Sequence, residues 1–318
     1  MRYRTLGDSG LRTSVVGLGC NAIGASLDKA RTTALVDAAI EEGVTLFDTA
    51  EAYGEPAGAS EELLGAALAG RRDQVVLATK FGGPGRHRPD DGRGEARGAP
   101  GGRSSIRRAV EGSLRRLRTD YLDLYQYHVP DGVTPIEETL AALTELVREG
   151  KVRYVGSSNL PGWRIAEAAH VARAGGHAPF VATQTHWSLL ERGAEREVVP
   201  AAVHYGVGVL PFFPLDHGLL TGKVRRGQEP PAGSRLARLP HLVTPEKLDR
   251  VEALASWGDR YGRSVLEVAI GALAALPGCG SVIAGATSPE QIRANAAAGD
   301  WEPTAGELAE ITALVPPG

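Results

Sequence analysis

Cysteine, methionine and aromatic residues are scarce in this chain of 318 residues, which holds two cysteines, one methionine and 5% aromatics. Cys20 and Cys279 alone cannot build a disulfide scaffold, so we expect a reduced, cytoplasmic protein held together by its hydrophobic core. No Cys-x-x-Cys or Cys/His spacing marks a metal site, and the sequence therefore predicts no metal.

Long apolar runs and a strong charge of one sign are also missing. No stretch of about 20 uncharged apolar residues occurs, and residues 1–7 lack the apolar core of a signal peptide, so we expect no membrane partner. The formal net charge of −3 supplies no basic field for nucleic acid. The arginine clusters at 71–72 and 115–118 are therefore expected to be solvated helix surface. Nothing in the composition indicates an oligomeric state.

Short apolar runs alternate with helical patterns along the whole chain. We expect strands at residues 15–19, 45–48, 74–80, 122–127, 152–155, 180–185, 208–212 and 281–284. Helical patterns lie at 28–42, 60–68, 104–117, 135–148, 163–173, 195–204, 245–260, 265–276 and 289–298. Eight strand-then-helix units indicate parallel strands, and they predict one α/β domain over residues 1–318, a (β/α)8 TIM barrel.

A doubly wound open sheet is the competing architecture. Its first strand is usually followed by Gly-x-Gly-x-x-Gly, whereas residues 17–22 read GLGCNA and lack the third glycine, which favours the barrel. Residues 7–10 have the composition of a hairpin turn, which we expect to cover the far end of the barrel. Stretches rich in glycine and proline predict long loops after strands three and seven, at 82–103 and 221–243.

Four side chains able to hold or move a proton fall where neighbouring strands end. Asp48 ends the second strand, Lys80 ends the third, and His128 follows the fourth, while Tyr53 lies in the loop after the second. Singly, each has an ordinary structural explanation, such as a turn cap or a core histidine. Together they converge on one mouth of the barrel, where TIM-barrel active sites lie.

These four side chains make a coherent chemical set. A tyrosine with a pKa near ~10 is a poor acid at neutral pH, and a lysine ammonium beside it lowers that pKa. An aspartate keeps the lysine charged, and a histidine hydrogen-bonds a carbonyl oxygen. Such a set donates a proton to an oxygen as hydride reaches the carbon, without a metal.

Six segments resemble the aldo-keto reductase family, in order and over nearly the whole chain. They are 47–54 (FDTAEAYG), 78–80 (ATK), 122–128 (LDLYQYH), 150–159 (GKVRYVGSSN), 218–223 (GLLTGK) and 285–291 (GATSPEQ). The resemblance implies a barrel that reduces a small-molecule aldehyde or ketone by hydride transfer from NADP(H) or NAD(H). It implies that Asp48, Tyr53, Lys80 and His128 are the catalytic residues, with Tyr53 as general acid.

The same resemblance implies where the cofactor binds. Ser158, Asn159 and Gln184 would hold the nicotinamide carboxamide, and Phe212 would stack on its ring. The other implied contacts are Gly19, Cys20, Asn21, Pro214, Leu215, Gly218, Leu220, Lys223, Arg235, Gly285, Thr287, Gln291 and Asn295. Residues 285–288 lack the basic residue of many NADP-dependent relatives, so we expect Arg293 or Arg235 to bind the 2′-phosphate of a preferred NADP(H).

Three alternatives stay open. An aldose or alcohol 1-dehydrogenase would run the same chemistry backwards. A cofactor-sensing regulatory barrel, like the potassium-channel β-subunits that share this fold, is disfavoured by the complete set of four catalytic residues. A metal-dependent barrel hydrolase is disfavoured by the absence of clustered ligand spacing. The loops at 22–27, 82–103 and 215–238 are expected to select the substrate, and His186 and Trp187 either shape the pocket or pack ordinarily.

Overall fold

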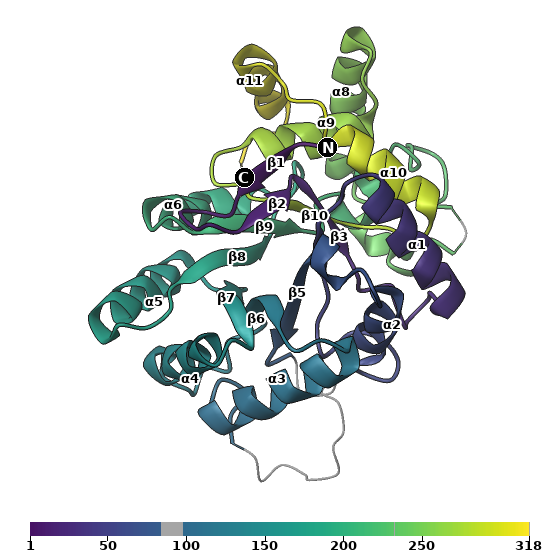
Figure 1. The fold of residues 1–318 in the computed structure, drawn as a ribbon. Coiled ribbons are helices and arrows are strands. Elements are labelled where there is room, and N and C mark those ends of the chain that lie inside the picture. The colour runs from purple at the N-terminus through teal and green to yellow at the C-terminus, as the bar shows by residue number, and fades with distance from the viewer. Residues whose placement is uncertain (84–97, 232, 318) are drawn as a thin grey trace.

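The computed structural model describes residues 1–83, 98–231 and 233–317, and these form a barrel of parallel strands behind an antiparallel hairpin. The hairpin consists of β1 (Tyr3–Thr5) and β2 (Arg12–Ser14). The barrel strands are β3 (Val16–Gly19), β4 (Leu46–Asp48), β5 (Val76–Phe81), β6 (Leu122–Tyr127), β7 (Val152–Ser158), β8 (Phe180–His186), β9 (Gly208–Phe212) and β10 (Val282–Gly285). Figure 1 shows them as a ring with helices outside it.

The barrel closes between its last two strands. The eight strands are hydrogen-bonded in the order β10-β3-β4-β5-β6-β7-β8-β9, so β9 and β10 are the two ends that must meet. At the seam, the Val209 N–H donates to the Gly278 carbonyl (2.8 Å) and the Gly280 N–H donates to the Val209 carbonyl (2.7 Å). The predicted (β/α)8 barrel is therefore confirmed, and the doubly wound open sheet is excluded.

The helices pack their apolar faces against the outside of the strands. In α4 (Ile136–Arg148), the buried side chains of Ile136, Leu140 and Leu143 recur at the helical period and face the barrel. The other surrounding helices are α1 (Lys29–Glu41), α2 (Ala59–Ala67), α3 (Arg103–Leu117), α5 (Gly162–Gly175), α6 (Val198–His204), α9 (Val265–Ala275) and α10 (Pro289–Ala298), with 3-10 turns η1 (Arg72–Gln74) and η3 (Gly193–Arg196). None of the helices in the described ranges has the length and apolarity needed to cross a bilayer.

The long segment after β9 contains more structure than its sequence predicted. It begins with η4 (Asp216–Thr221) and then holds the short helix α7 (Arg235–Arg238) and η5 (Pro240–Leu242), where we expected a loop. The helices α8 (Pro245–Tyr261) and α11 (Ala305–Leu314) lie together on this flank (Figure 1), and Glu310 accepts a hydrogen bond from Trp257 Nε1 (2.8 Å). The sequence analysis missed α11. Most of the other expected loop, at 82–103, lies outside the described residues, because 84–97 are not among them.

The hairpin covers the end of the barrel where the strands begin, as expected. The Leu6 N–H donates to the Leu11 carbonyl (2.8 Å). Both leucines pack with side chains from inside the barrel, among them Leu46, Leu124 and Leu210. Because apolar side chains fill this end, the C-terminal ends of the strands are where a polar site can lie.

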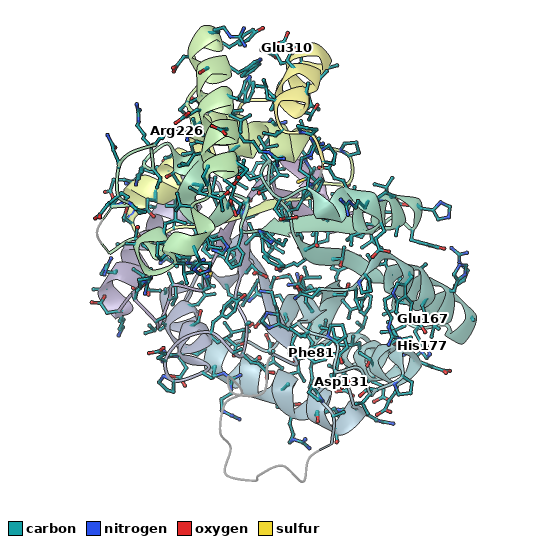
Figure 2. The ribbon with its side chains drawn as sticks, turned by 180° about the vertical axis from the view of Figure 1, so that it is seen from behind. Phe81, Asp131, Glu167, His177, Arg226 and Glu310 are labelled. Carbon is teal, nitrogen blue, oxygen red and sulfur yellow. The ribbon has the colours of Figure 1, made fainter. Side chains whose placement is uncertain are left out.

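The loop after β6 is tied to the start of α3 by one carboxylate. Asp131, labelled in Figure 2 near Phe81, accepts hydrogen bonds from the backbone N–H groups of Gly101 and Thr134, both 2.8 Å long. Its own N–H donates to the Tyr127 hydroxyl, and the Tyr127 ring stacks on Phe81 with centroids 5.1 Å apart. Burial raises the pKa of Asp131, but these backbone donors outweigh it and lower the pKa to about 2. The loop next to His128 is thereby fixed.

A buried ion pair ties α2 and α3 to strand β5. Glu61 has no exposed surface, and its Oε2 accepts from Arg116 Nε at 2.7 Å. Its Oε1 accepts from the Thr79 hydroxyl at 2.6 Å, and Thr79 directly precedes Lys80 in β5. The expectation that the cluster at 115–118 is solvated surface is therefore wrong for Arg116, whose partner is a buried carboxylate 55 residues earlier.

Replacing this carboxylate by a neutral amide should destabilise the fold. Glu61→Gln leaves the mostly buried Arg116 side chain without its counter-charge, and we expect the free energy of unfolding to fall by about 3 kcal/mol in urea titrations. Glu62→Gln, an exposed position in the same helix, is the matched control and should change it by less than about 0.5 kcal/mol. Equal effects of the two substitutions would contradict a stabilising role for the pair.

Candidate active site

The ends of β4, β5 and β6 bring the four expected side chains into one cluster. The Lys80 ammonium donates to Asp48 Oδ2 (2.5 Å), to the Thr49 carbonyl (2.9 Å) and to the Tyr53 hydroxyl (3.4 Å). The Tyr53 and His128 rings meet edge to face, with centroids 5.9 Å apart and planes at 82°. Parallel register explains the grouping, because it places the C-terminal ends of neighbouring strands at the same edge.

Two glutamines hold the second oxygen of Asp48. Gln126 Nε2 donates to Asp48 Oδ1 at 3.1 Å, and Gln184 Nε2 donates to the same oxygen at 2.6 Å. The sequence analysis missed Gln126, although it lies two residues before His128 and so on the same face of β6. Gln184 was expected at the nicotinamide carboxamide, and here its amide nitrogen is directed to Asp48 and to Gln126 Oε1.

Burial sets the protonation states of the cluster. Burial alone would lower the pKa of Lys80, but Asp48 and Tyr53 outweigh it, so the pKa is raised and the ammonium stays charged. Burial raises the pKa of Tyr53 more than the Lys80 charge lowers it. The expectation of a net lowering of the Tyr53 pKa is therefore wrong, because desolvation of a phenolate at this position outweighs one neighbouring cation. At neutral pH the phenol keeps its proton.

His128 is neutral for the same reason. Burial, helped by the Lys80 charge, lowers the pKa of His128 to about 3. Its Nδ1 is buried and has no hydrogen-bond partner in the part of the chain that the structure describes. A buried nitrogen without a partner costs free energy, so this Nδ1 suits a polar ligand atom that would complete it.

The His128 pKa predicts a pH-dependent stability. The imidazole binds a proton in the unfolded chain below its ordinary pKa of 6.5 but not in the folded one until about 3, so stability falls as the pH falls through this range. We expect wild type to lose about 1 kcal/mol per pH unit more than His128→Gln in urea unfolding below neutral pH. His204→Gln, at an exposed position, should keep the wild-type slope. The same slope in His128→Gln would contradict the lowered pKa.

The expected carboxamide-binding residues lie beside the cluster of Asp48, Tyr53, Lys80 and His128. Asn159 Nδ2 donates to the His128 carbonyl at 2.9 Å and to Ser158 Oγ at 3.0 Å, at the end of β7. Asn159 has φ of 58°, a left-handed conformation that asparagine tolerates better than most residues. Ser158 and Asn159 therefore form, with His128, a polar border on one side of the mouth.

The residues expected around the adenosine end form a second connected group. Gln291 Oε1 accepts from the Thr287 N–H at 2.9 Å, and Asn295 Nδ2 donates to the Gly285 carbonyl at 3.4 Å. A Cβ at Gly285 would meet its nearest neighbour, Asn21 Oδ1, only at 3.9 Å. The ends of β3 and β10, which carry Gly19, Asn21 and Gly285, thus lie side by side and leave space next to the backbone.

In the segment after β9, some of the side chains that were expected to contact the cofactor are buried. Phe212 stacks in parallel on His186, with ring centroids 5.7 Å apart. Gly218 has φ of 111°, and a Cβ there would meet only Leu236, at 3.9 Å, so its backbone is open to a ligand. In this segment Leu215 is half-buried and Lys223 is exposed, whereas Pro214 and Leu220 are buried, as is Cys20 after β3. Trp187 is fully buried and donates to Glu195 Oε1, which supports ordinary packing.

Two expected cations, Arg293 and Arg235, and one that was not expected, Arg31, have defined partners here. Arg293 pairs with Glu41 at 3.1 Å and with Glu42 at 3.6 Å. Arg235 lies over the Phe213 ring at 5.3 Å, and burial lowers its pKa while the nearby Tyr53 opposes that shift. Arg31 lies beside the residues that were expected at the adenosine end, and its Nη2 donates to the Thr287 carbonyl at 3.5 Å. The sequence analysis missed Arg31, because only folding brings it to a residue 256 positions away.

Comparisons with known proteins agree with this geometry. The model of the Aldo/keto reductase family matches residues 15–316. Uncharacterized oxidoreductase YrpG of Bacillus subtilis (strain 168) is 39% identical over 92% of this chain and 89% of its own length. Aldo-keto reductase YhdN of the same organism is 34% identical over 99% of this chain and 94% of its own length. A probable voltage-gated potassium channel subunit beta of Oryza sativa subsp. japonica is 35% identical over 95% and 92%, respectively.

The family match covers nearly the whole chain, and the relatives align over almost their full length. The chain therefore belongs to the aldo/keto reductase family, a family of oxidoreductases.

Proposed function

We propose that this protein reduces an aldehyde or ketone to the alcohol with NADPH, and that Tyr53 is the general acid. One observation carries the proposal: a single buried ammonium, Lys80 Nζ, lies between Asp48 Oδ2 (2.5 Å) and the Tyr53 hydroxyl (3.4 Å). This arrangement connects a proton donor to a fixed positive charge inside the barrel mouth. We further propose that residues 1–318 act as one cytoplasmic domain.

The proton comes from the Tyr53 hydroxyl. As negative charge develops on the substrate oxygen, Tyr53 transfers its proton to that oxygen, and Lys80 stabilises the phenolate that remains. Asp48 keeps Lys80 charged, while Gln126 and Gln184 hold Asp48 in place through its Oδ1. When bound, a reduced nicotinamide supplies the hydride that reaches the carbonyl carbon.

His128 orients the substrate and does not act as the acid. With a pKa of about 3, His128 is not an imidazolium at neutral pH and so cannot transfer a proton as an acid. Its neutral ring still has one N–H, which can donate a hydrogen bond to the carbonyl oxygen. The raised pKa of Tyr53 keeps the phenol protonated, which suits reduction. Oxidation by an aldose or alcohol 1-dehydrogenase would need the phenolate as base, so these protonation states favour the reductive direction.

The residues present fit a nicotinamide dinucleotide. Ser158 and Asn159 offer polar groups next to His128, which suits a carboxamide. The open backbone at Gly218 and Gly285 permits the close approach that a pyrophosphate and a ribose need. Phe212, half-buried at the end of β9, offers a ring face at the position where the family stacks an aromatic on the nicotinamide.

Removing the Tyr53 hydroxyl tests the proposed acid. Tyr53→Phe should lower kcat for carbonyl reduction by about a thousandfold, because the proton donor is lost, while the NADPH dissociation constant measured by fluorescence stays within about twofold. Tyr205→Phe, which removes a hydroxyl bonded to His170 on the outside of the barrel, is the matched control and should keep full turnover. Unchanged turnover in Tyr53→Phe would overturn the assignment.

The preference for NADPH tests the position of the 2′-phosphate. Arg31 lies at Thr287 without a carboxylate partner among the described residues, whereas Arg293 is paired with Glu41. We therefore expect Arg31→Ala to weaken NADPH binding about tenfold and NADH binding little, as loss of one charge-assisted contact predicts. Arg293→Ala and Arg235→Ala should leave the ratio of the two affinities within about twofold. A larger change in this ratio for Arg293→Ala or Arg235→Ala would show that the substituted arginine binds the 2′-phosphate instead.

A cofactor-sensing regulatory role is the second candidate, favoured by the 35% identity to a probable potassium channel subunit beta. The two candidates differ in turnover. We expect a panel of aldehydes, ketones and sugars to include compounds that the wild type reduces, as followed by the absorbance of the reduced nicotinamide. Tight NADPH binding without turnover of any compound would favour the regulatory role instead.

A further inference from the structure

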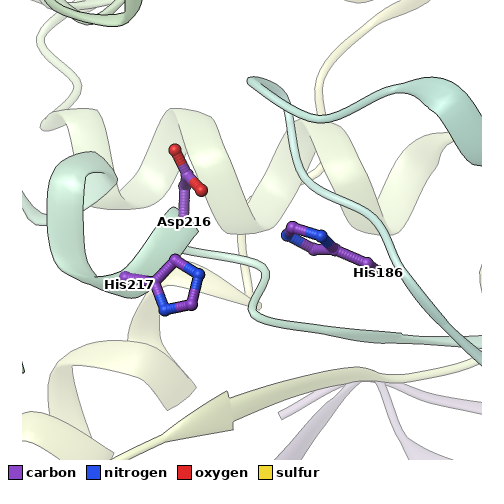
Figure 3. A group of neighbouring side chains, drawn as sticks. All are labelled: His186, Asp216 and His217. Atoms are coloured by element: carbon purple, nitrogen blue, oxygen red, sulfur yellow. The ribbon is translucent and has the colours of Figure 1, made fainter. Parts of the chain in front are cut away.

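A second cluster of polar side chains lies after β8 and β9, apart from the four catalytic side chains. His186 ends β8, and Asp216 and His217 follow β9 at the start of η4. One donor atom from each of the three side chains lies within 4.8 Å of the other two. Figure 3 shows the two imidazoles and the carboxylate turned toward a common space.

Each of these side chains has a buried atom without a partner. Among the described residues, His186 Nε2, Asp216 Oδ1 and His217 Nδ1 are buried and make no hydrogen bond. Asp216 is only 1% exposed. Buried polar atoms are almost always satisfied, so three unsatisfied ones in neighbouring side chains indicate a ligand shared among them.

The local backbone directs these side chains inward. Asp216 and His217 are consecutive non-glycine residues with positive φ, 43° and 60°. Left-handed conformations are costly for such residues, and the surrounding structure must hold them. The His217 ring packs on Phe213 with centroids 4.3 Å apart, and the His186 ring stacks on Phe212. Both imidazoles are therefore fixed by aromatic packing, which leaves their nitrogens free to coordinate.

We propose that His186, Asp216 and His217 bind a divalent transition-metal ion, with Zn²⁺ as the representative of the class. Two imidazole nitrogens and one carboxylate oxygen are ligands that zinc and its neighbours take readily, whereas magnesium and calcium prefer oxygen alone. Three protein ligands leave a fourth position of a tetrahedral ion open.

Lys247 is compatible with this site. Its ammonium donates to Asp216 Oδ2 at 2.7 Å, so it occupies the oxygen that the site does not use. Metal-binding carboxylates are commonly held by such an outer hydrogen bond, which fixes the orientation of the coordinating oxygen. The spacing of the ligands explains why the sequence did not predict the site, because Asp216 and His217 follow His186 only after another helix and strand.

Metal titration of the untagged, chelator-treated protein tests the proposal. We expect calorimetry with ZnCl₂ to give one ion per chain, and Co²⁺ to give the visible absorption of a tetrahedral site. His186→Phe keeps the ring that stacks on Phe212, and His217→Asn tolerates the positive φ. Each should weaken Zn²⁺ binding by at least about 100-fold. Asp216→Asn, which removes only the charge, should also weaken it.

The control is His204→Ala, which removes an exposed imidazole and should leave the affinity unchanged. Thermal unfolding of each variant without metal verifies that it folds, and His186→Phe and His217→Asn provide independent tests if one of them does not. Binding of Zn²⁺ to wild type no tighter than to His186→Phe and His217→Asn would overturn the proposal, and would leave ordered water as the partner of the three atoms.

Discussion

The buried ion pair of Lys80 and Asp48 is the interaction on which the site depends. Both side chains are almost fully buried, at 1% and 3% exposure, so each charge is tolerable only because the other is present. The pair fixes the position of the Tyr53 hydroxyl, and it is itself held by Gln126 and Gln184 from two further strands. Lys80 lies at the end of one strand and Asp48 at the end of the neighbouring strand. The ion pair therefore forms only when the barrel has folded.

The same pair lets two neighbouring groups have different roles, because Lys80 keeps its charge while Tyr53 keeps the proton that it is proposed to give. Lys80 stays charged and Tyr53 stays neutral, although their atoms lie 3.4 Å apart, because the barrel withholds water from both. His128 is kept neutral by the same lack of water. At neutral pH one of these three neighbouring groups is thus charged and two are neutral, as the proposed carbonyl reduction requires.

Local sequence patterns predicted the eight strands, the hairpin and the meeting of Asp48, Tyr53, Lys80 and His128, because these depend on periodicity and on the rule that parallel strands end together. Local sequence patterns could not predict contacts between residues that lie far apart in the sequence. Arg31 contacts Thr287 across 256 positions, and Glu61 takes Arg116 out of solvent. The net pKa shift of Tyr53 was also out of reach, because its sign depends on how much water the finished barrel excludes. The helix α11 was missed although Thr304 and Glu307 form a capping box, which is a local signal.

The hairpin at the base of the barrel has a consequence for biosynthesis. The Arg4 guanidinium donates to the carbonyls of Ala274 and Cys279, and the Asp8 N–H donates to the Gly206 carbonyl. The hairpin therefore waits for partners that are translated roughly two hundred or more positions later. Until then Leu6 and Leu11 have no complete core to enter, and the nascent chain leaves these two side chains exposed. Because β1 and β2 cover the end of the barrel and pack against β10, this end can be completed only after β10 has been translated.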